Sequence, residues 1–89
     1  MEIVWDKAKN AILQEKRNVR FEDVAEKIIN NDYLALLEHP VKHGQVYYLI
    51  SLHDYVHVVP AVINRQEQIV LKTIFPSRKF NKIYGGIKK

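Results

Sequence analysis

The sequence predicts an α+β domain: two N-terminal helices packed on an antiparallel sheet of about four strands, then a short C-terminal helix. Helically spaced apolar residues fill the first third, and β-branched and aromatic residues fill the middle. A serine before helically spaced apolar residues marks the last segment. The 89 residues, 47% of them hydrophobic, suffice for one domain, residues 1–89, with a single core. In chain order, the opening letters MEIVW predict a short edge strand.

A first helix is predicted over residues 7–17. Asp6 is suited to cap its N-terminus, and Ala8 and Ile12 are expected to face inward, with Ala11 and Leu13 as further candidates. Asn18 tolerates the left-handed conformation that ends many helices, so we expect the helix to stop there.

The second helix has the clearest amphipathic pattern in the chain. Its apolar residues fall at i, i+3, i+4, i+7 and i+8: Phe21, Val24, Ala25, Ile28 and Ile29. Glu22 and Asp23 lie in its first turn, where acidic side chains complement the helix dipole. The polar run NND is expected to end it.

Strand-like patterns follow. The stretch YLALLE fits either a strand or a helix, whereas VYYLISL and YVHVVPAVI are separated only by His53 and Asp54 and predict a hairpin. The turn NRQEQ then leads to IVLKTIF, the last predicted strand.

The second hairpin strand has one valine-rich face, made of Val56, Val58, Pro60 and Val62. We assign this face to the core against the two helices, and Pro60 indicates an edge strand or a bulge. His57 points to the opposite face. It is either a partly buried sheet histidine with a hydrogen-bonded ring or a group that transfers protons near neutral pH.

Positive charge is concentrated at the C-terminal end. The net charge is +4, and residues 64–89 hold seven basic residues against one acid, which indicates a polyanionic partner. Arg78 and Lys79 fall in the first turn of the predicted last helix, where each cation costs roughly 0.3–1 kcal/mol. A phosphate bound there would offset this cost. The alternatives are an ion pair of Arg78 with Glu22 or Asp23, and a solvated Lys79.

Several kinds of chemistry are disfavoured. The chain has no cysteine, no Gly-x-Ser-x-Gly motif and no glycine-rich phosphate loop. His53 and His57 would lie about 13 Å apart along a strand, too far to share one zinc ion. His39 and His43 flank a proline loop without a cysteine to complete a metal site. We therefore expect no metal and no cofactor.

A cytoplasmic location is the default expectation. No run approaches the ~18 apolar residues of a membrane span, so no membrane association is expected. The opening residues lack the basic and apolar regions of a signal peptide.

Four short blocks of the sequence form one pattern: Trp5-Asp6, Lys9-Asn10, Phe21-Glu22-Asp23 and Arg78-Lys79. Together they resemble the pattern of BrnT-type toxins. The opening VWDKAKNAILQEKRNVRFEDVAEKI resembles that family's start, Trp-Asp-x-x-Lys-Asn, a helix ending in Lys-His-Gly, then Val-Ser-Phe-Glu-Asp. The close IFPSRKFNKIY is similar to the family's Ile-Ser-Ala-Arg-Lys-Ala-Thr segment, which runs on to a tyrosine. Lys16 matches the family lysine, but Arg17-Asn18 replaces His-Gly and Arg20 replaces the serine. Arg17 keeps its charge and cannot shuttle protons.

The resemblance implies a RelE-like fold and a ribonuclease toxin of a bacterial type II toxin–antitoxin pair, which inhibits translation and growth. A ribbon-helix-helix antitoxin encoded adjacently would be its partner, in a complex of two toxins and two antitoxins. The substrate would be RNA, free or on the ribosome.

Metal-independent RNA cleavage needs proton transfer and stabilisation of phosphoryl charge while the 2′-OH attacks. We assign catalytic roles to Arg78, His57 and Lys79, with Arg78 stabilising charge and His57 transferring a proton. The expected RNA-binding residues are Lys16, His53, Arg65, Lys72 and Lys82. The alternative is a non-catalytic basic module that sequesters an acidic antitoxin segment or contacts nucleic acid in a repressor complex.

Overall fold

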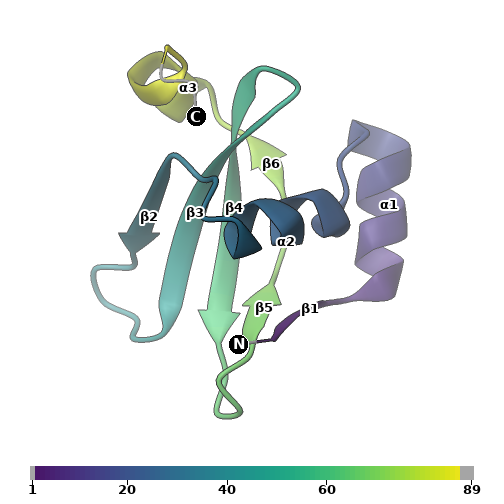
Figure 1. The fold of residues 1–89 in the computed structure, drawn as a ribbon, viewed down its shortest axis with the longest axis vertical. Coiled ribbons are helices and arrows are strands. Elements are labelled where there is room, and N and C mark those ends of the chain that lie inside the picture. The colour runs from purple at the N-terminus through teal and green to yellow at the C-terminus, as the bar shows by residue number, and fades with distance from the viewer. Residues whose placement is uncertain (1, 87–89) are drawn as a thin grey trace.

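The computed structural model describes residues 2–86 and shows a mixed α+β fold (Figure 1). Within these residues the elements are β1 (Ile3–Trp5), α1 (Lys7–Arg17), α2 (Phe21–Ile29), β2 (Ala35–Glu38), β3 (Gln45–Leu52), β4 (Tyr55–Ile63), β5 (Ile69–Leu71), β6 (Phe75–Pro76) and α3 (Arg78–Tyr84). Lys88 and Lys89, part of the basic C-terminal end, lie outside the described residues.

The limits of α1 follow the prediction. Asp6 accepts a hydrogen bond from the backbone N–H of Lys9 at 2.9 Å, which caps the helix. Asn18 takes the left-handed conformation, with φ of 56°, and ends it.

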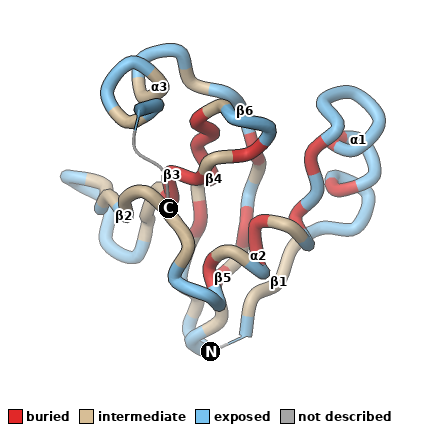
Figure 2. Tube along the Cα trace, turned by 45° about the horizontal axis from the view of Figure 1, so that its top comes forward, coloured by how far each residue is buried: buried red, intermediate tan, exposed pale blue. Residues whose placement is uncertain are grey.

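The inward face of α1 was predicted correctly only for the candidate Leu13 and wrongly for Ala8, Ala11 and Ile12. Ala8 and Ile12 are exposed, and the buried residues are Asn10 and Leu13. Figure 1 shows the reason: α1 lies beside the sheet edge rather than across the sheet, so a narrow strip of the helix is covered. Figure 2 shows the same helix as mostly exposed.

Helix α2 crosses the face of the sheet (Figure 1) and buries Phe21, Val24, Ala25 and Ile28. Ile29 is the exception to the predicted pattern, since 70% of it is exposed. The N-terminus of α2 has no cap from its own flanking residue, Arg20, because a guanidinium has no acceptor for the helix N–H groups; this side chain donates to Asp23 instead.

The sheet has six strands in the order β1-β5-β4-β3-β2, with β6 pairing beside β4, rather than about four. It is not wholly antiparallel, because β1 runs parallel to β5. The predicted last strand, residues 69–75, is interrupted and forms β5 and β6. The hairpin of β3 and β4 is confirmed. Its two turn residues, His53 and Asp54, both have positive φ, as a tight two-residue turn requires.

Pro60 lies in the central strand β4, so its assignment to an edge was wrong and its link to a bulge was right. Its carbonyl accepts the N–H of Lys72 at 2.9 Å, beyond the end of β5. The register shifts by one residue between β5 and β6, opposite Pro60, so its missing N–H breaks no regular ladder.

The two sides of the sheet carry separate cores. The helix side, covered by α1 and α2, contains Phe21, Ile50, Val59 and Ala61 in its larger cluster. On the other side, which we call the α3 side, Leu49, Val56 and Val58 pack against Phe80 and Tyr84. Assigning the valine-rich face to the two helices was therefore wrong: that face points to the α3 side.

Candidate functional site

His57 is a buried ionisable side chain on the helix side of β4, with 7% of its surface exposed. Its Nδ1 lies 2.9 Å from the carbonyl oxygen of Tyr55. Because a carbonyl only accepts, Nδ1 must carry the proton, and Nε2 then carries a lone pair. Within residues 2–86, every fully buried side-chain nitrogen has a hydrogen-bond partner. His57 Nε2 makes no hydrogen bond, so this atom is not fully buried and keeps contact with solvent.

Burial lowers the pKa of His57 below its ordinary value of 6.5. The Tyr55 carbonyl opposes this effect, while the positive charges of His53 and Arg17 add to it. His57 is therefore a neutral imidazole near pH 7, with an exposed lone pair that can take up a proton.

Two basic side chains beside His57 are held by backbone carbonyls. A guanidinium nitrogen of Arg17 donates to the carbonyl of Ile74 at 2.7 Å, which joins the end of α1 to the β5–β6 connection. His53 Nε2 lies 2.8 Å from the carbonyl of Asn18. We call Arg17, His53 and His57 the His57 cluster.

Sequence reasoning missed Arg17 as a member of this group. The signal was present: Arg17 occupies the position of the histidine in the BrnT-type pattern. The sequence does not show that Arg17 lies beside His57, because the two residues are forty positions apart. Their proximity results from the hydrogen bond between Arg17 and the Ile74 carbonyl.

Other cations gather at the same end of the sheet. Figure 1 shows the β3–β4 hairpin at the top of the molecule, with α3 at the upper left and the end of α1 at the upper right. Lys16 in the last turn of α1 is exposed, and so are Arg78, Lys79 and Lys82 of α3. A polyanion crossing this end would meet positive charge from both sides of the sheet.

Arg78 and His57 belong to opposite sides of the sheet. Helix α3 packs on the α3 side, whereas His57 points to the helix side. No hydrogen bond or ion pair within residues 2–86 joins the two side chains. The suggested ion pairs of Arg78 with Glu22 or Asp23 are likewise not found among these residues, and Asp23 pairs instead with Arg20.

The capping prediction for α3 is confirmed, since the Ser77 hydroxyl accepts the N–H of Phe80 at 3.2 Å. The Lys79 ammonium lies 5.5 Å from the centroid of the Phe80 ring, a cation–π distance. Lys79 thus has a packing role independent of any ligand.

Two further expected RNA-binding residues lie away from the His57 cluster. Arg65 is in the β4–β5 turn at the other end of the sheet, and the strand from His57 to the end of β4 at Ile63 is roughly 20 Å long. Lys72 is exposed just after β5 and points to the α3 side.

Within residues 2–86, no three side chains of metal-ligating type lie close enough to hold an ion. Nδ1 of His39 accepts the backbone N–H groups of Val41 and Lys42, both at 3.1 Å, so this histidine orders its own loop.

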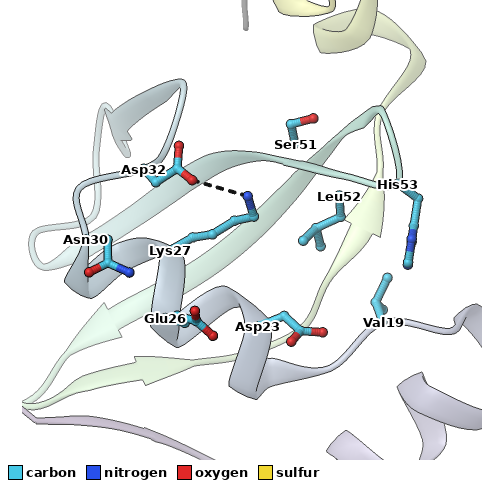
Figure 3. A pocket seen from close by; sticks show the side chains of 9 residues that line it. All are labelled: Val19, Asp23, Glu26, Lys27, Asn30, Asp32, Ser51, Leu52 and His53. Atoms are coloured by element: carbon cyan, nitrogen blue, oxygen red, sulfur yellow. Dashed lines mark hydrogen bonds and ion pairs between the residues drawn. The ribbon is translucent and has the colours of Figure 1, made fainter. Parts of the chain in front are cut away.

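A cavity of about 320 Å³ lies between α2 and the end of β3 (Figure 3). His53 forms part of its wall next to the His57 cluster. Three carboxylates also line it, and two of them are engaged: Asp23 with Arg20 at 2.9 Å and Asp32 with Lys27 at 3.4 Å. This acidic lining is unsuited to a phosphate, so we exclude the cavity from the phosphate path.

No helix within residues 2–86 is long and apolar enough to cross a membrane. Comparisons of the chain with protein-family models, with curated proteins and with solved structures returned no match.

Proposed function

We propose that the chain is a metal-independent ribonuclease toxin of a bacterial type II toxin–antitoxin pair. One observation carries this proposal: a buried, neutral His57 presents its free Nε2 at the end of the sheet where exposed cations converge. The resemblance of the sequence to BrnT-type toxins supports the same class.

The chemistry uses the RNA's own 2′-OH. His57 Nε2 accepts the proton of this hydroxyl as its oxygen attacks the adjacent phosphorus, and the bond to the 5′ oxygen breaks. The leaving oxygen takes a proton from a general acid or from water. The products are a 2′,3′-cyclic phosphate and a 5′-hydroxyl.

The guanidinium of Arg17 is suited to stabilise charge on the attacked phosphate, because it lies on the helix side with His57. Arg78 and Lys79 would then bind the next phosphates as the RNA crosses to the α3 side. Lys16 extends the path at the end of α1, and Lys82 extends it along α3. Arg65 and Lys72 would contribute through long-range attraction.

The alternative function is a non-catalytic basic module that binds an acidic antitoxin segment. The separation of Arg78 from His57 onto opposite sides of the sheet favours this alternative. In this position Arg78 would bind a partner on the α3 side and would not act on the same phosphate as His57. In either case the partner would be a ribbon-helix-helix antitoxin, with two copies of each chain.

The test is RNA cleavage by purified protein in the presence of EDTA, with growth after induction followed in parallel. We expect cleavage and growth arrest from the wild type, loss of both from His57→Gln, and a strong reduction from Arg78→Ala. Arg65→Ala is the matched control, since it removes the same charge at the far end of the sheet. Wild-type activity in His57→Gln would refute the proton-transfer role, and no cleavage by any form would favour the binding module.

A further inference from the structure

The middle of the α3 side is apolar, although a solvent-facing side of an antiparallel sheet is ordinarily polar. Six residues form what we call the open apolar face: Val4, Leu37, Tyr47, Pro60, Val62 and Val70. They form two rows in direct register across the strands. Leu37, Tyr47 and Pro60 make one row, and Val62, Val70 and Val4 make the other.

All six residues are half-buried, and those in β4 and β5 alternate with buried residues of the helix side. In β5, Val70 stands between Ile69, 6% exposed, and Leu71, 2% exposed. The same alternation occurs in β4, where Ala61 is buried between Pro60 and Val62. The helix side is thus covered by α1 and α2, whereas no element within residues 2–86 buries the open apolar face to the same extent.

Helix α3 packs on one end of the α3 side, next to the open apolar face, whose Leu37 and Tyr47 contact the same cluster. Its Phe80 and Tyr84 pack on the cluster that holds Val56 and Val58, close to the hairpin. The α3 side of the strands is therefore less covered at the end away from the hairpin. Each row spans three neighbouring strands, and the two rows together cross five strands, or about 19 Å, which matches a helix of about 13 residues.

The charged side chains beside this face are mainly basic, and the acid next to Val4, Glu2, accepts a hydrogen bond from the Gln68 amide at 2.6 Å. Lys72, whose N–H bonds the Pro60 carbonyl, follows Val70 in strand alternation and points to the same side. The adjoining α3 contributes three cations and no acid: Arg78, Lys79 and Lys82. None of the strand residues that form the face is acidic.

We propose that the open apolar face is the docking surface for an acidic amphipathic helix of a partner protein. Apolar side chains on such a helix would cover the valines, and its carboxylates would pair with Lys72 and the α3 cations. RNA fits less well, since its phosphates would lie over valine and proline. A second copy fits less well too, because a symmetric contact would oppose like charges.

The proposal shares the α3 cations with the proposed RNA path, but it does not depend on RNA cleavage, because the open apolar face has no part in that path and is tested by binding. The probe is a labelled synthetic helix of about 12 residues, with leucine along one face and glutamate elsewhere. A matched peptide carries lysine in place of every glutamate. Binding is followed by fluorescence anisotropy and by amide shifts in NMR spectra of the whole chain.

We expect the acidic peptide to bind and to shift the amides of Leu37, Tyr47, Val62 and Val70. Val62→Glu and Lys72→Glu should each weaken binding by about tenfold or more, since each places a like charge against the peptide. Lys72→Glu leaves the packing untouched, so it remains informative if Val62→Glu unfolds. Ile29→Glu, at an exposed position of α2, is the control and should bind as the wild type.

Four results would overturn the proposal. The first is equal binding of the lysine peptide, and the second is no binding of the acidic one. The third is a single-stranded RNA oligonucleotide that shifts the same amides more strongly. The fourth is concentration-dependent dimerisation of the free chain that shifts them, which would assign the face to a second copy.

Discussion

The side-chain carbonyl of Asn10 accepts the backbone N–H of Phe21 at 2.8 Å, so a residue of α1 caps the N-terminus of α2. The amide nitrogen of Asn10 donates to Glu22 at 2.8 Å, and this bond lowers the pKa of that carboxyl. Asn10 is only 9% exposed. One buried amide therefore fixes the angle between the two helices and satisfies a helix terminus whose own flanking residue does not cap it.

Asn10→Ala is predicted to destabilise the fold by about 1–3 kcal/mol, because it leaves the buried N–H of Phe21 without an acceptor. Urea denaturation followed by the emission of Trp5, which packs 5.9 Å from the Phe21 ring, measures the change. Ile12→Ala on the same helix is half exposed and should cost far less. Equal losses in the two variants would contradict this role of Asn10.

Asn81 ties α3 to the hairpin, since its side-chain oxygen accepts the N–H of Val56 at 3.0 Å. Asn81→Ala is predicted to cost about 1–2 kcal/mol and to release α3 locally. The measurement is hydrogen exchange, in which the Val56 amide should exchange faster while that of Val59 stays protected. Asn30→Ala, at an exposed position, serves as the control.

The pKa of His57 predicts a pH dependence of stability. Its folded-state pKa lies below the ordinary value of 6.5, so the unfolded chain binds the proton more readily than the folded one. Stability contributed by neutral His57 is complete above about pH 6.5 and decreases as the pH falls below it. Urea midpoints from about pH 7 to 5 should decline in the wild type.

In His57→Gln this decline should be smaller, because no buried imidazole remains to be protonated. His43→Gln, which removes an exposed histidine, should follow the wild-type curve. A His57→Gln curve parallel to the wild type would show that another group is responsible.

Arg17→Ala is predicted to lower kcat/KM for RNA by about a hundredfold or more, as expected when a charge-stabilising donor is lost. Lys16→Ala, one residue away and without a backbone anchor, should raise KM more than it lowers kcat. Initial rates over a range of RNA concentrations separate the two effects. Similar losses in kcat for both variants would contradict a specific role of Arg17.

Local features of the fold could be predicted because neighbouring residues determine them. Asp6 and Asn18 delimit α1, the spacing from Phe21 to Ile28 defines α2, and the His53-Asp54 pair marks the hairpin. Each depends on a cap, a period or a turn within a few residues.

What could not be predicted depends on partners far apart in the chain. Both sides of β4 are apolar, so alternation identified two faces but not which of them meets the helices. The placement of Arg17 beside His57 likewise results from the path of α1 along the sheet edge. The interruption between β5 and β6 could not be predicted either, because the only sequence signal for it was Pro60 in the neighbouring strand.

The parallel pairing of β1 with β5 has a consequence for synthesis. Ile3 pairs with Ile69, so β1 cannot pair in the sheet until β5, much later in the chain, has been synthesised. Until residue 71 is made, α2 has no completed sheet to cover, and its apolar stripe stays open to chaperones and to other nascent chains. Such long-range closure also makes folding slow for a chain of this size. Production of the folded protein is therefore expected to respond more to chaperone supply than to changes in helix propensity.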